Sequence, residues 1–580
     1  MLNTYFEQEL GRLRSLASEF AELNPALAPM LGADVAPDPD VERLLEGVAF
    51  LTGLMRQRLD DDFPEFVQTL VQLLMPHFLR PWPCMTIMQF QPQGPLGGTV
   101  TLAANIAVAS VPVDGMRTIF RTSFPVTVEP LALRSASWDG GAGTQRSLLL
   151  EFAFEGVTPQ AWQGRKLGLY LADAMPDAAR LLLLLARYVR EVHVFAAGEA
   201  VTVLPADSIS ITGLHADALL LPQSENAHPA YELLREYFAF PEKFLHISID
   251  GFERWLARGS SGRFSLRVVF DELPDWAPAV HDESFLLNTT PAVNLFDAQA
   301  HPLHLDDRQP AWQLQFPQKD GRHLTQVFSI EQVSGYADGE TQRYVAFGTA
   351  NADEPVYHTT LRESPLREGV DCHISVVQPR DGAGNARGEP RESATRTLSV
   401  DALCTHGALP EVLRLGDICH PTDSSPARMN FRNIRRISPY RVPVLDQRLL
   451  WRLVSQLNLN HRQLAGRDQL CALLALQFTG GRSTPADAAH QRRVDAIESF
   501  AVKPADRLMN GLLVSGCEIE LVCRSDAFMN IGGLFLFGAV LDDFFAGTVA
   551  LNAFSALSIT DSLTGGKLQW PAKIGQQHLL

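Results

Sequence analysis

The stretch YELLREYFAFPEKF, from Tyr231 to Phe244, carries the strongest signal for the fold of this chain. Five of its fourteen residues are aromatic, and they lie among leucines and acidic residues before Pro241 interrupts the run. Because a proline disfavours helical geometry at the residue before it, we expect a helix that stops at Phe240. The stretch contains no candidate nucleophile and no metal-ligand cluster. We therefore expect it to pack against the rest of the chain or against a partner protein.

The first 80 residues carry the periodicity of amphipathic helices. Apolar residues there recur every three or four positions, which places them on one helix face. The first stripe is Phe6, Leu10, Leu13, Ala17 and Phe20. The second stripe is Val41, Leu44, Val48, Leu51 and Met55.

Other features of this region support the same interpretation. Asp38 and Pro39 are suited to the cap and the first turn of the second helix, and a third apolar stretch runs from Phe66 to Leu74. Each stripe covers only about two heptads, which is too short to indicate a coiled coil by itself. The helices can therefore pack on their own chain or join a bundle with the helices of a partner.

From Pro81 onward the pattern changes to the alternation that is typical of β-strands. Segments such as MTIMQFQ and SLLLEFAFEG lie between glycines and prolines. We expect four regions: a helical region at 1–80, a β-rich region at 81–230, a second β-rich region at 231–440 and a C-terminal α+β region at 441–580. A Gly-, Pro- and charge-rich stretch at 379–393 predicts a mobile loop. We expect a helix followed by a strand at 179–195, in which the leucine run at 181–185 belongs to the core. We also expect an amphipathic helix at 445–459 and an apolar helix at 534–554. The fold class is therefore multidomain α+β.

Composition limits the function classes. The 580 residues carry a net charge of −17, which opposes non-specific binding to nucleic acid or to an anionic membrane surface. The seven cysteines are odd in number and widely spaced, so we expect reduced, buried thiols in a cytoplasmic protein. No secretory signal pattern is visible, and the apolar runs stop short of the ~18 residues that a membrane span needs. We expect no direct membrane insertion.

No motif in the sequence predicts catalysis or a cofactor. His301 and His304, with Asp306 and Asp307, form the densest group of metal-ligand types, but the group lacks the HExxH pattern and paired cysteines. We expect these side chains to be polar residues that face solvent, with a metal site as the alternative. The glycine pair at 532–533 suits a tight turn or an anion site, and we favour the turn. The five arginines between 428 and 441 are expected to pair with acids of this chain or of a partner.

Several blocks of this sequence, in order over the whole chain, resemble the TssF family (ImpG/VasA) of type VI secretion baseplate subunits. Besides YELLREYFAFPEKF they are LMPHFLRPWPCM (74–85), LLNTTPAVNLF (286–296), LSVDALCTHGALP (398–410), LLWRLVSQLNLN (449–460), FLFGAVLDDFFA (535–546) and the terminal WPAKIG. The chain departs from the family pattern at His406-Gly407 and at Gly547-Thr548.

The resemblance implies a structural, non-enzymatic subunit with a fold similar to the wedge proteins of contractile phage baseplates. It implies two copies of this chain with one TssG in each wedge, and contacts with TssK, TssE and a central VgrG hub. It also implies docking through partners on a membrane complex, at the inner face of the cytoplasmic membrane, and a role in triggering contraction of the tail.

The helical stripes and the aromatic segments are the candidate partner interface. Its residues are Phe6, Leu10, Leu13, Phe20, Leu44, Val48, Leu51, Tyr231, Tyr237, Phe238, Phe240, Phe537, Phe544 and Phe545. Two rival functions stay open at this point. One is a metal-dependent hydrolase built on the His301 group, and the other is a stand-alone protein that binds a ligand with its β domains.

Overall fold

The computed structural model describes the chain from residue 2 to residue 575 with internal gaps. The gaps are 24–38, 140–146, 215–217, 224–227, 306–308, 318–324, 338–339, 350–353, 365–368, 378–395, 447–449, 451–465, 479–484 and 510. The expected mobile loop at 379–393 and most of the expected helix at 445–459 therefore lie outside the described residues. Contacts within the chain divide it into two compact units, Met1–Gln72 and Leu73–Leu580.

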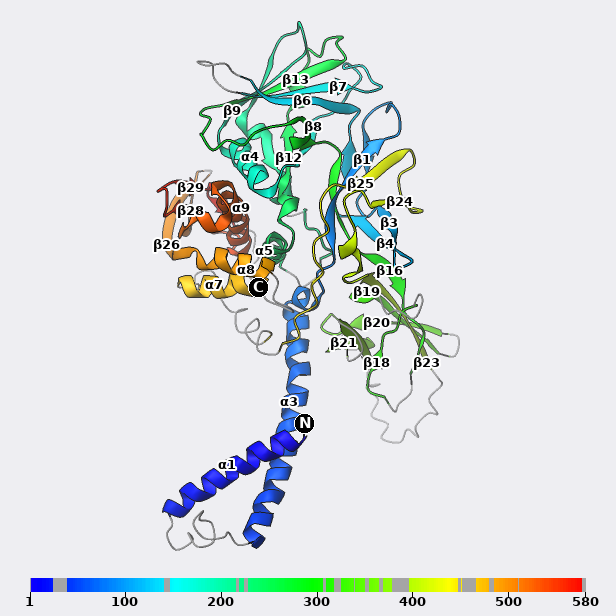
Figure 1. Ribbon diagram of the computed structural model, residues 1–580, viewed down its shortest axis with the longest axis vertical. Coiled ribbons are helices and arrows are strands. Elements are labelled where there is room, and N and C mark those ends of the chain that lie inside the picture. The colour runs from blue at the N-terminus through cyan, green and yellow to red at the C-terminus, as the bar shows by residue number, and fades with distance from the viewer. Residues whose placement is uncertain are drawn as a thin grey trace. The chain divides into compact units, whose positions relative to one another are not determined.

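The described residues of the first unit form two helices, in the regions where the periodicity predicts helix. Helix α1 spans Leu2–Leu23, and α3 spans Pro39–Leu74, with its last two residues in the second unit (Figure 1). The second and third apolar stretches thus belong to one helix of 36 residues. The side chains of Arg14 on α1 and Glu42 on α3 form an ion pair, and Leu10 and Ala49 are buried.

The second unit opens with a six-stranded antiparallel sheet that collects strands from distant parts of the sequence. Its strand order is β24 (Ile418–Pro421), β3 (Ala107–Val113), β4 (Met116–Thr122), β15 (Thr289–Val293), β1 (Met85–Pro92) and β25 (Met429–Asn433). Met85 pairs with Val293 and Met88 pairs with Asn433. A two-stranded sheet, β2 (Val100–Leu102) with β5 (Val126–Val128), lies in the same part of the sequence. The six-stranded sheet therefore takes strands from both sides of the boundary expected at residue 230.

Two further sheets share a buried core with helix α4 (Met175–Arg187). The five-stranded sheet has the order β10 (Thr202–Pro205), β9 (Val189–Phe195), β13 (Arg263–Phe270), β7 (Ser147–Phe154) and β6 (Leu131–Asp139). The four-stranded sheet has the order β11 (Ile209–Ile211), β12 (His246–Asp250), β8 (Lys166–Leu171) and β14 (Phe285–Leu286). The expected helix followed by a strand at 179–195 is confirmed by α4 and β9.

An eight-stranded sheet with its own small core occupies residues 296–405. Its order is β16 (Phe296–Gln299), β23 (Arg396–Thr405), β19 (Gln326–Ala337), β20 (Glu340–Ala346), β21 (Val356–Glu363), β22 (Val370–Val377) and β18 (Trp312–Gln313), with β17 (Leu303–Leu305) on β23. Strands β20 and β21 are parallel, and the other strand pairs described in this sheet are antiparallel. Val333, Ile374 and Leu398 are fully buried in its core.

From Arg467 onward, the described residues of the C-terminal part form three α-helices and a sheet. The helices are α7 (Arg467–Leu476), α8 (Pro485–Asp495) and α9 (Ile531–Thr548). The sheet has the order β26 (Ile497–Met509), β27 (Leu512–Cys523), β28 (Phe554–Asp561) and β29 (Lys567–Gln569), with β30 (Lys573–Ile574) on β28. The helix expected at 534–554 ends at Thr548, because Phe554 already begins a strand.

Helix α5 (Pro229–Ala239) forms from the segment that opened the sequence analysis, and the 3₁₀ helix η4 (Pro241–Leu245) follows it. The expected stop at Pro241 is therefore confirmed. The other 3₁₀ helices are η1 (Pro76–Leu79), η2 (Ala206–Ser208), η3 (Thr212–Leu214), η5 (Phe252–Arg254), η6 (Asp282–Ser284), η7 (Leu409–Val412) and η9 (Ser525–Phe528).

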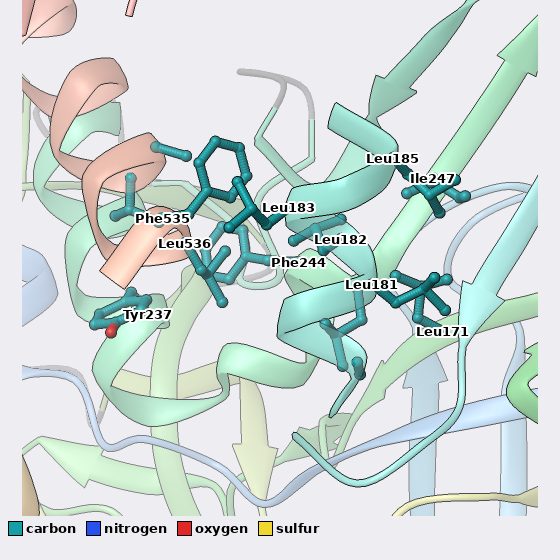
Figure 2. Close-up of a cluster of buried hydrophobic side chains, with 14 of the residues drawn as sticks. Leu171, Leu181, Leu182, Leu183, Leu185, Tyr237, Phe244, Ile247, Phe535 and Leu536 are labelled. Carbon is teal, nitrogen blue, oxygen red and sulfur yellow. The ribbon is translucent and has the colours of Figure 1, made fainter. Parts of the chain in front are cut away.

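Helix α4 lies at the centre of the large core. In Figure 2, Leu181 and Leu185 point toward Leu171 and Ile247, whereas Leu182 and Leu183 point toward Phe244 and Phe535. The leucine run at 181–185 is buried on both sides, since it separates the strands β8 and β12 from the helix α9. A helix that is apolar around its whole circumference is typical of a protein core.

Helix α9 packs closely on α4 and α5 because glycines allow it. A Cβ at Gly532 would lie 2.5 Å from the backbone of Ala179, and a Cβ at Gly547 would lie 2.7 Å from the Cβ of Ala230. The Asn530 side chain caps the Gly533 amide at 3.0 Å. Gly532 and Gly533 lie in the first turn of α9 itself, which corrects the expectation of a tight turn before the helix, and the departure from the family pattern at Gly547 has a packing reason.

The length of α9 corrects the expectation that the apolar runs of this chain stop short of a membrane span. Among the described helices, α9 is long and apolar enough to cross a membrane by length and composition, but 78% of it is buried inside the chain, as in a core helix.

Candidate functional site

One face of α3 carries an apolar stripe that the chain leaves open. Leu44, Val48, Leu51 and Met55 are between 45% and 69% exposed, and their spacing of four, three and four residues places them on one helix face. A contiguous exposed apolar face of this kind marks an interaction site more often than it marks an ordinary surface. We call these four residues the α3 stripe.

The candidate residues on α1 divide between the interior and the surface of the helical unit. Leu10 is buried, Phe6 and Leu13 are half-buried, and Phe20 is exposed. Replacing Leu10 would therefore disturb the helical unit itself, so it cannot report on a partner alone. The exposed candidates Phe20, Leu44, Val48 and Leu51 are the ones that a partner could cover.

The aromatic candidates in the second unit lie inside the chain, which corrects the expectation that they face a partner. Tyr237, Phe238, Phe240, Phe537, Phe544 and Phe545 are each at most 3% exposed, and Tyr231 is half-buried. Their rings pack on one another across α5 and α9. The ring centroids of Tyr237 and Phe537 are 5.6 Å apart, and those of Tyr231 and Phe544 are 5.2 Å apart in an edge-to-face arrangement. The alternative stated for this segment, packing on the rest of the chain, is the one that these contacts support.

Charged residues of α5 and of the following 3₁₀ helix η4 are buried in the same core. Lys243 is 0% exposed and its ammonium forms an ion pair with the carboxylate of Glu236, which is 1% exposed. Lys243 also donates to the Ala218 carbonyl at 2.8 Å, and Glu236 accepts from the Leu220 amide at 2.7 Å. Burial raises the pKa of Glu236 and lowers the pKa of Lys243, and the attraction between them offsets both shifts.

Arg235 joins α5 to the segment where the β structure begins. Its guanidinium lies 4.6 Å from the ring centroid of Phe78 and 4.8 Å from that of Trp82, and it donates to the His77 carbonyl. Trp82 forms a bridge with Arg441, so it anchors this junction as a rigid packing residue. Burial raises the pKa of the nearby Glu232 to about 7, with Glu236 adding to the shift.

Two arginines of the basic stretch, Arg435 and Arg441, make contacts within the fold. Arg435 donates to the Tyr170 hydroxyl at 2.8 Å and to the Asp173 carbonyl at 2.7 Å. Arg441 forms an ion pair with Asp487 at 2.9 Å, which confirms the expected pairing with an acid of this chain.

The histidine group brings together no metal site among the residues that the structure describes. His304 on β17 lies 3.3 Å from the Thr397 hydroxyl through its Nδ1, and Asp306 and Asp307 lie outside the described residues. Across the described ranges, no group of three or more His, Cys, Asp or Glu is placed to hold a metal ion.

The cysteines are free thiols. Five are buried, Cys471 is half-buried and Cys419 is exposed, so the prediction of buried thiols is confirmed for five of them. Burial raises the pKa of Cys372 to about 12.

One exposed apolar feature escaped the sequence analysis. Leu508, Leu512 and Leu513 at the tip of the β26–β27 hairpin are between 70% and 75% exposed. The sequence LMNGLLV contains an Asn-Gly pair between apolar residues, which is the strongest short-range signal for a β-hairpin and could have located this tip.

Comparison with known proteins identifies the family. The family model described as "Type VI secretion system, TssF" matches residues 1–577. This chain belongs to the TssF family. It is 31% identical over 623 residues to the type VI secretion system component TssF1 of Pseudomonas aeruginosa, covering 99% of this chain and 98% of the relative.

Two solved structures share the fold. A chain of a TssK–TssF–TssG baseplate subcomplex of the type VI secretion system matches 92% of this TssF-family chain at a TM-score of 0.73 and 24% identity, over 99% of its own length. A chain of the type VI secretion baseplate complex matches over the full length of both chains at a TM-score of 0.63 and 23% identity. The α+β architecture expected from the sequence is therefore the fold of chains found in these assemblies.

Proposed function

We propose that this chain is a structural subunit of the type VI secretion baseplate wedge and performs no catalysis. Membership of the TssF family and a fold shared with a chain of a TssK–TssF–TssG subcomplex support this role. We propose TssG and TssK as its direct partners, with two copies of this chain for each TssG. TssE, a VgrG hub and recruitment to the inner face of the cytoplasmic membrane through the assembled baseplate complete the proposal.

The α3 stripe carries the proposal at the level of residues. Burying a fully exposed leucine-sized side chain stabilises an interface by about 1.5–3 kcal/mol. The four residues of the stripe are 45–69% exposed, so covering them contributes roughly 4–7 kcal/mol before the costs of association. A helix of TssG with its own apolar stripe would cover this face by side-to-side helix packing. We infer that the stripe is the part of a shared helical bundle that this chain supplies.

Such a subunit works by mechanical coupling, in which movement passes from one subunit of the baseplate to the next. A ring of wedges must hold one arrangement until it is triggered and then shift to another, which requires two packings of similar free energy that contacts can bias.

Co-expression with the TssG-like subunit tests the proposal. We expect a complex with two copies of this chain per TssG, measured as mass by size-exclusion chromatography with light scattering. The variant Leu44→Asp/Leu51→Asp removes two apolar contacts and places two charges in the interface, and we expect it to weaken the complex by about 10²–10⁴-fold.

The matched control is Leu256→Asp. Leu256 is 87% exposed in the second unit, so the same change of chemistry at an equally accessible leucine should leave the complex intact. Unchanged co-purification of the α3 variant would contradict the assignment of this face. A chain that elutes alone, with a mass of 63.9 kDa, in the presence of TssG would contradict the proposed function itself.

A further inference from the structure

The basic stretch of the sequence divides between the inside and the outside of the fold. Arg435 and Arg441 bind groups of this chain. Arg428, Arg432 and Arg436 are instead exposed, and within the described residues their guanidinium groups form no ion pair. We call these three residues the arginine strip. Such arginines can pair with acids of this chain or with acids of another protein, and the strip is the part that this chain leaves unpaired.

The edge strand β25 displays the first half of the strip. Asn430 and Arg432 are exposed, whereas Met429 and Phe431, which alternate with them, are buried in a core beneath the sheet. Because alternate side chains of a strand share a face, Asn430 and Arg432 point to the same side of the sheet. Arg428 stands in the turn before β25 with a φ of 61°, a left-handed geometry that favours glycine or asparagine. An arginine therefore occupies a position where the backbone does not favour it.

Backbone hydrogen bonds hold the second half of the strip against β1. The Ile434 amide donates to the Ile87 carbonyl at 2.9 Å, and the Ser438 amide donates to the Met85 carbonyl at 2.9 Å. Arg436 lies between these two contacts, so the strip follows one line of backbone beside β1, as Figure 1 shows for β25. At about 3.4 Å per residue, that line is at most about 27 Å long. Its fixed backbone lowers the entropy that a partner must remove on binding.

Acidic residues are missing from the sequence around the strip. The chain has 66 acidic residues and a net charge of −17, yet none of them lies between 424 and 445 or within β1. In the register of β1 and β25, Gln89 lies opposite Arg432 and Gln91 lies opposite Asn430. The side chains beside the strip are therefore amides, which offer hydrogen bonds without neutralising the arginines.

A loop covers the free edge of β25 and excludes one kind of binding. The Gly416 amide donates to the Asn433 carbonyl at 3.0 Å, and the Asn433 side chain donates to the Arg414 carbonyl at 3.0 Å. The loop carries both Arg414 and Asp417, so it adds no net charge to the strip. Because the edge is occupied here, a partner strand cannot extend the sheet at this point, and recognition must go through side chains.

An acidic protein face suits the strip better than a nucleic acid or a membrane does. The planar fork of arginine binds carboxylates through paired hydrogen bonds, and arginine is enriched at protein interfaces. A folded acidic face can contact the strip alone. A nucleic acid or an anionic membrane extends beyond the strip and would also face the rest of a chain whose net charge of −17 repels it.

We propose that the arginine strip docks on an acidic face of another baseplate protein, whose carboxylates pair with Arg428, Arg432 and Arg436. This inference deepens the proposed function and rests on it for the assembly that supplies the partner. It gives the second unit a polar contact of its own, whereas contact with TssG is assigned to the apolar α3 stripe.

Photo-cross-linking from the strip tests the proposal. Benzoylphenylalanine replaces Asn430, which is exposed, so that all three arginines stay in place. The full chain is co-expressed with TssG, TssK, TssE and VgrG, and the purified assembly is irradiated and digested. We expect mass spectrometry to join position 430 to a segment of another baseplate protein in which Asp and Glu outnumber Lys and Arg.

Charge variants separate electrostatic attraction from shape. Arg428→Glu/Arg432→Glu places like charges opposite the carboxylates of the partner and should lower the cross-link yield by about tenfold or more. Arg428→Lys/Arg432→Lys keeps the positive charges and should retain more of the yield. Arg263→Glu is the matched control, because Arg263 on β13 is exposed and also forms no ion pair within the described residues, and it should leave the yield unchanged.

The outcomes that would overturn the proposal are distinct. Cross-links formed mainly with lipid, with nucleic acid, with a second copy of this chain or with a segment that has no acidic excess would overturn it. Equal yields from the double Glu variant and from Arg263→Glu would do the same. Loss of TssG co-purification would contradict the baseplate role itself, whereas an intact assembly that gives no cross-link from position 430 would contradict the docking of the strip alone.

Discussion

Removing the buried ammonium of Lys243 should open the α5 core locally. In Lys243→Met the carboxylate of Glu236, which is 1% exposed, loses its ion pair, and the Ala218 carbonyl loses its donor. Breaking a buried ion pair by deleting one partner costs about 3–5 kcal/mol, because the remaining charge stays buried without compensation. Breaking an ion pair on the protein surface costs only about 0–1 kcal/mol.

Local hydrogen exchange is the suitable assay, because a chain of this size with two compact units does not unfold in one step. The Leu220 amide donates to Glu236, so peptides that cover residues 218–222 report on this contact. A loss of 3–5 kcal/mol corresponds to exchange that is about 10²–10⁴-fold faster, at 1.36 kcal/mol for each factor of ten.

A double variant separates the charge from the packing. Glu236→Gln/Lys243→Met buries no charge, so it should exchange more slowly than Lys243→Met alone. Lys503→Met is the matched control, since its pair with Glu520 is exposed, and it should change exchange by less than about tenfold.

The pH dependence has a defined sign. Burial already raises the pKa of Glu236, and Lys243 opposes that shift, so Lys243→Met raises this pKa further. A carboxyl whose folded pKa lies above its unfolded value of about 4.3 destabilises the fold increasingly as the pH rises between the two values. The defect should therefore be larger at pH 8 than at pH 5. A defect that is equal at both pH values, or no larger than that of Lys503→Met, would refute this reasoning.

Two further predictions concern packing and thiol reactivity. Gly547→Ala should lower the free energy of unfolding by about 1–3 kcal/mol, seen as a lower thermal midpoint, because its Cβ would lie 2.7 Å from that of Ala230. Gly11→Ala is the control, because open space surrounds its Cβ, and it should be neutral or stabilising. Equal effects of the two substitutions would contradict the packing argument. A maleimide should label the exposed Cys419 in the native chain but Cys372 only after denaturation, since burial shields that thiol and raises its pKa to about 12; prompt native labelling of Cys372 would contradict the fold around it.

Local patterns predicted the elements whose signal is contained in neighbouring residues. The helical stripes became α1 and α3, the leucine run became α4, and Pro241 ended α5. These outcomes depend on helix periodicity, on burial of leucines and on the backbone of proline, which act within a few residues.

The aromatic segment shows where local patterns stop. YELLREYFAFPEKF is apolar enough to pack on something, but its sequence alone does not distinguish a partner from the chain itself. The structure resolves this because α9, about 300 residues later in the sequence, covers Tyr237 with Phe537. Side chains that meet across such a separation leave no joint signature in either segment.

The sequence by itself determined the helical start, the β-rich middle, the buried thiols and the family, because composition, periodicity and ordered motifs are properties of the linear chain. Only the tertiary structure decided which apolar surfaces stay open. It covered the rings of α5 and α9 and exposed the α3 stripe. Exposure depends on what lies opposite a side chain in space, and strand pairing brings together residues whose distance along the chain carries no information about that contact.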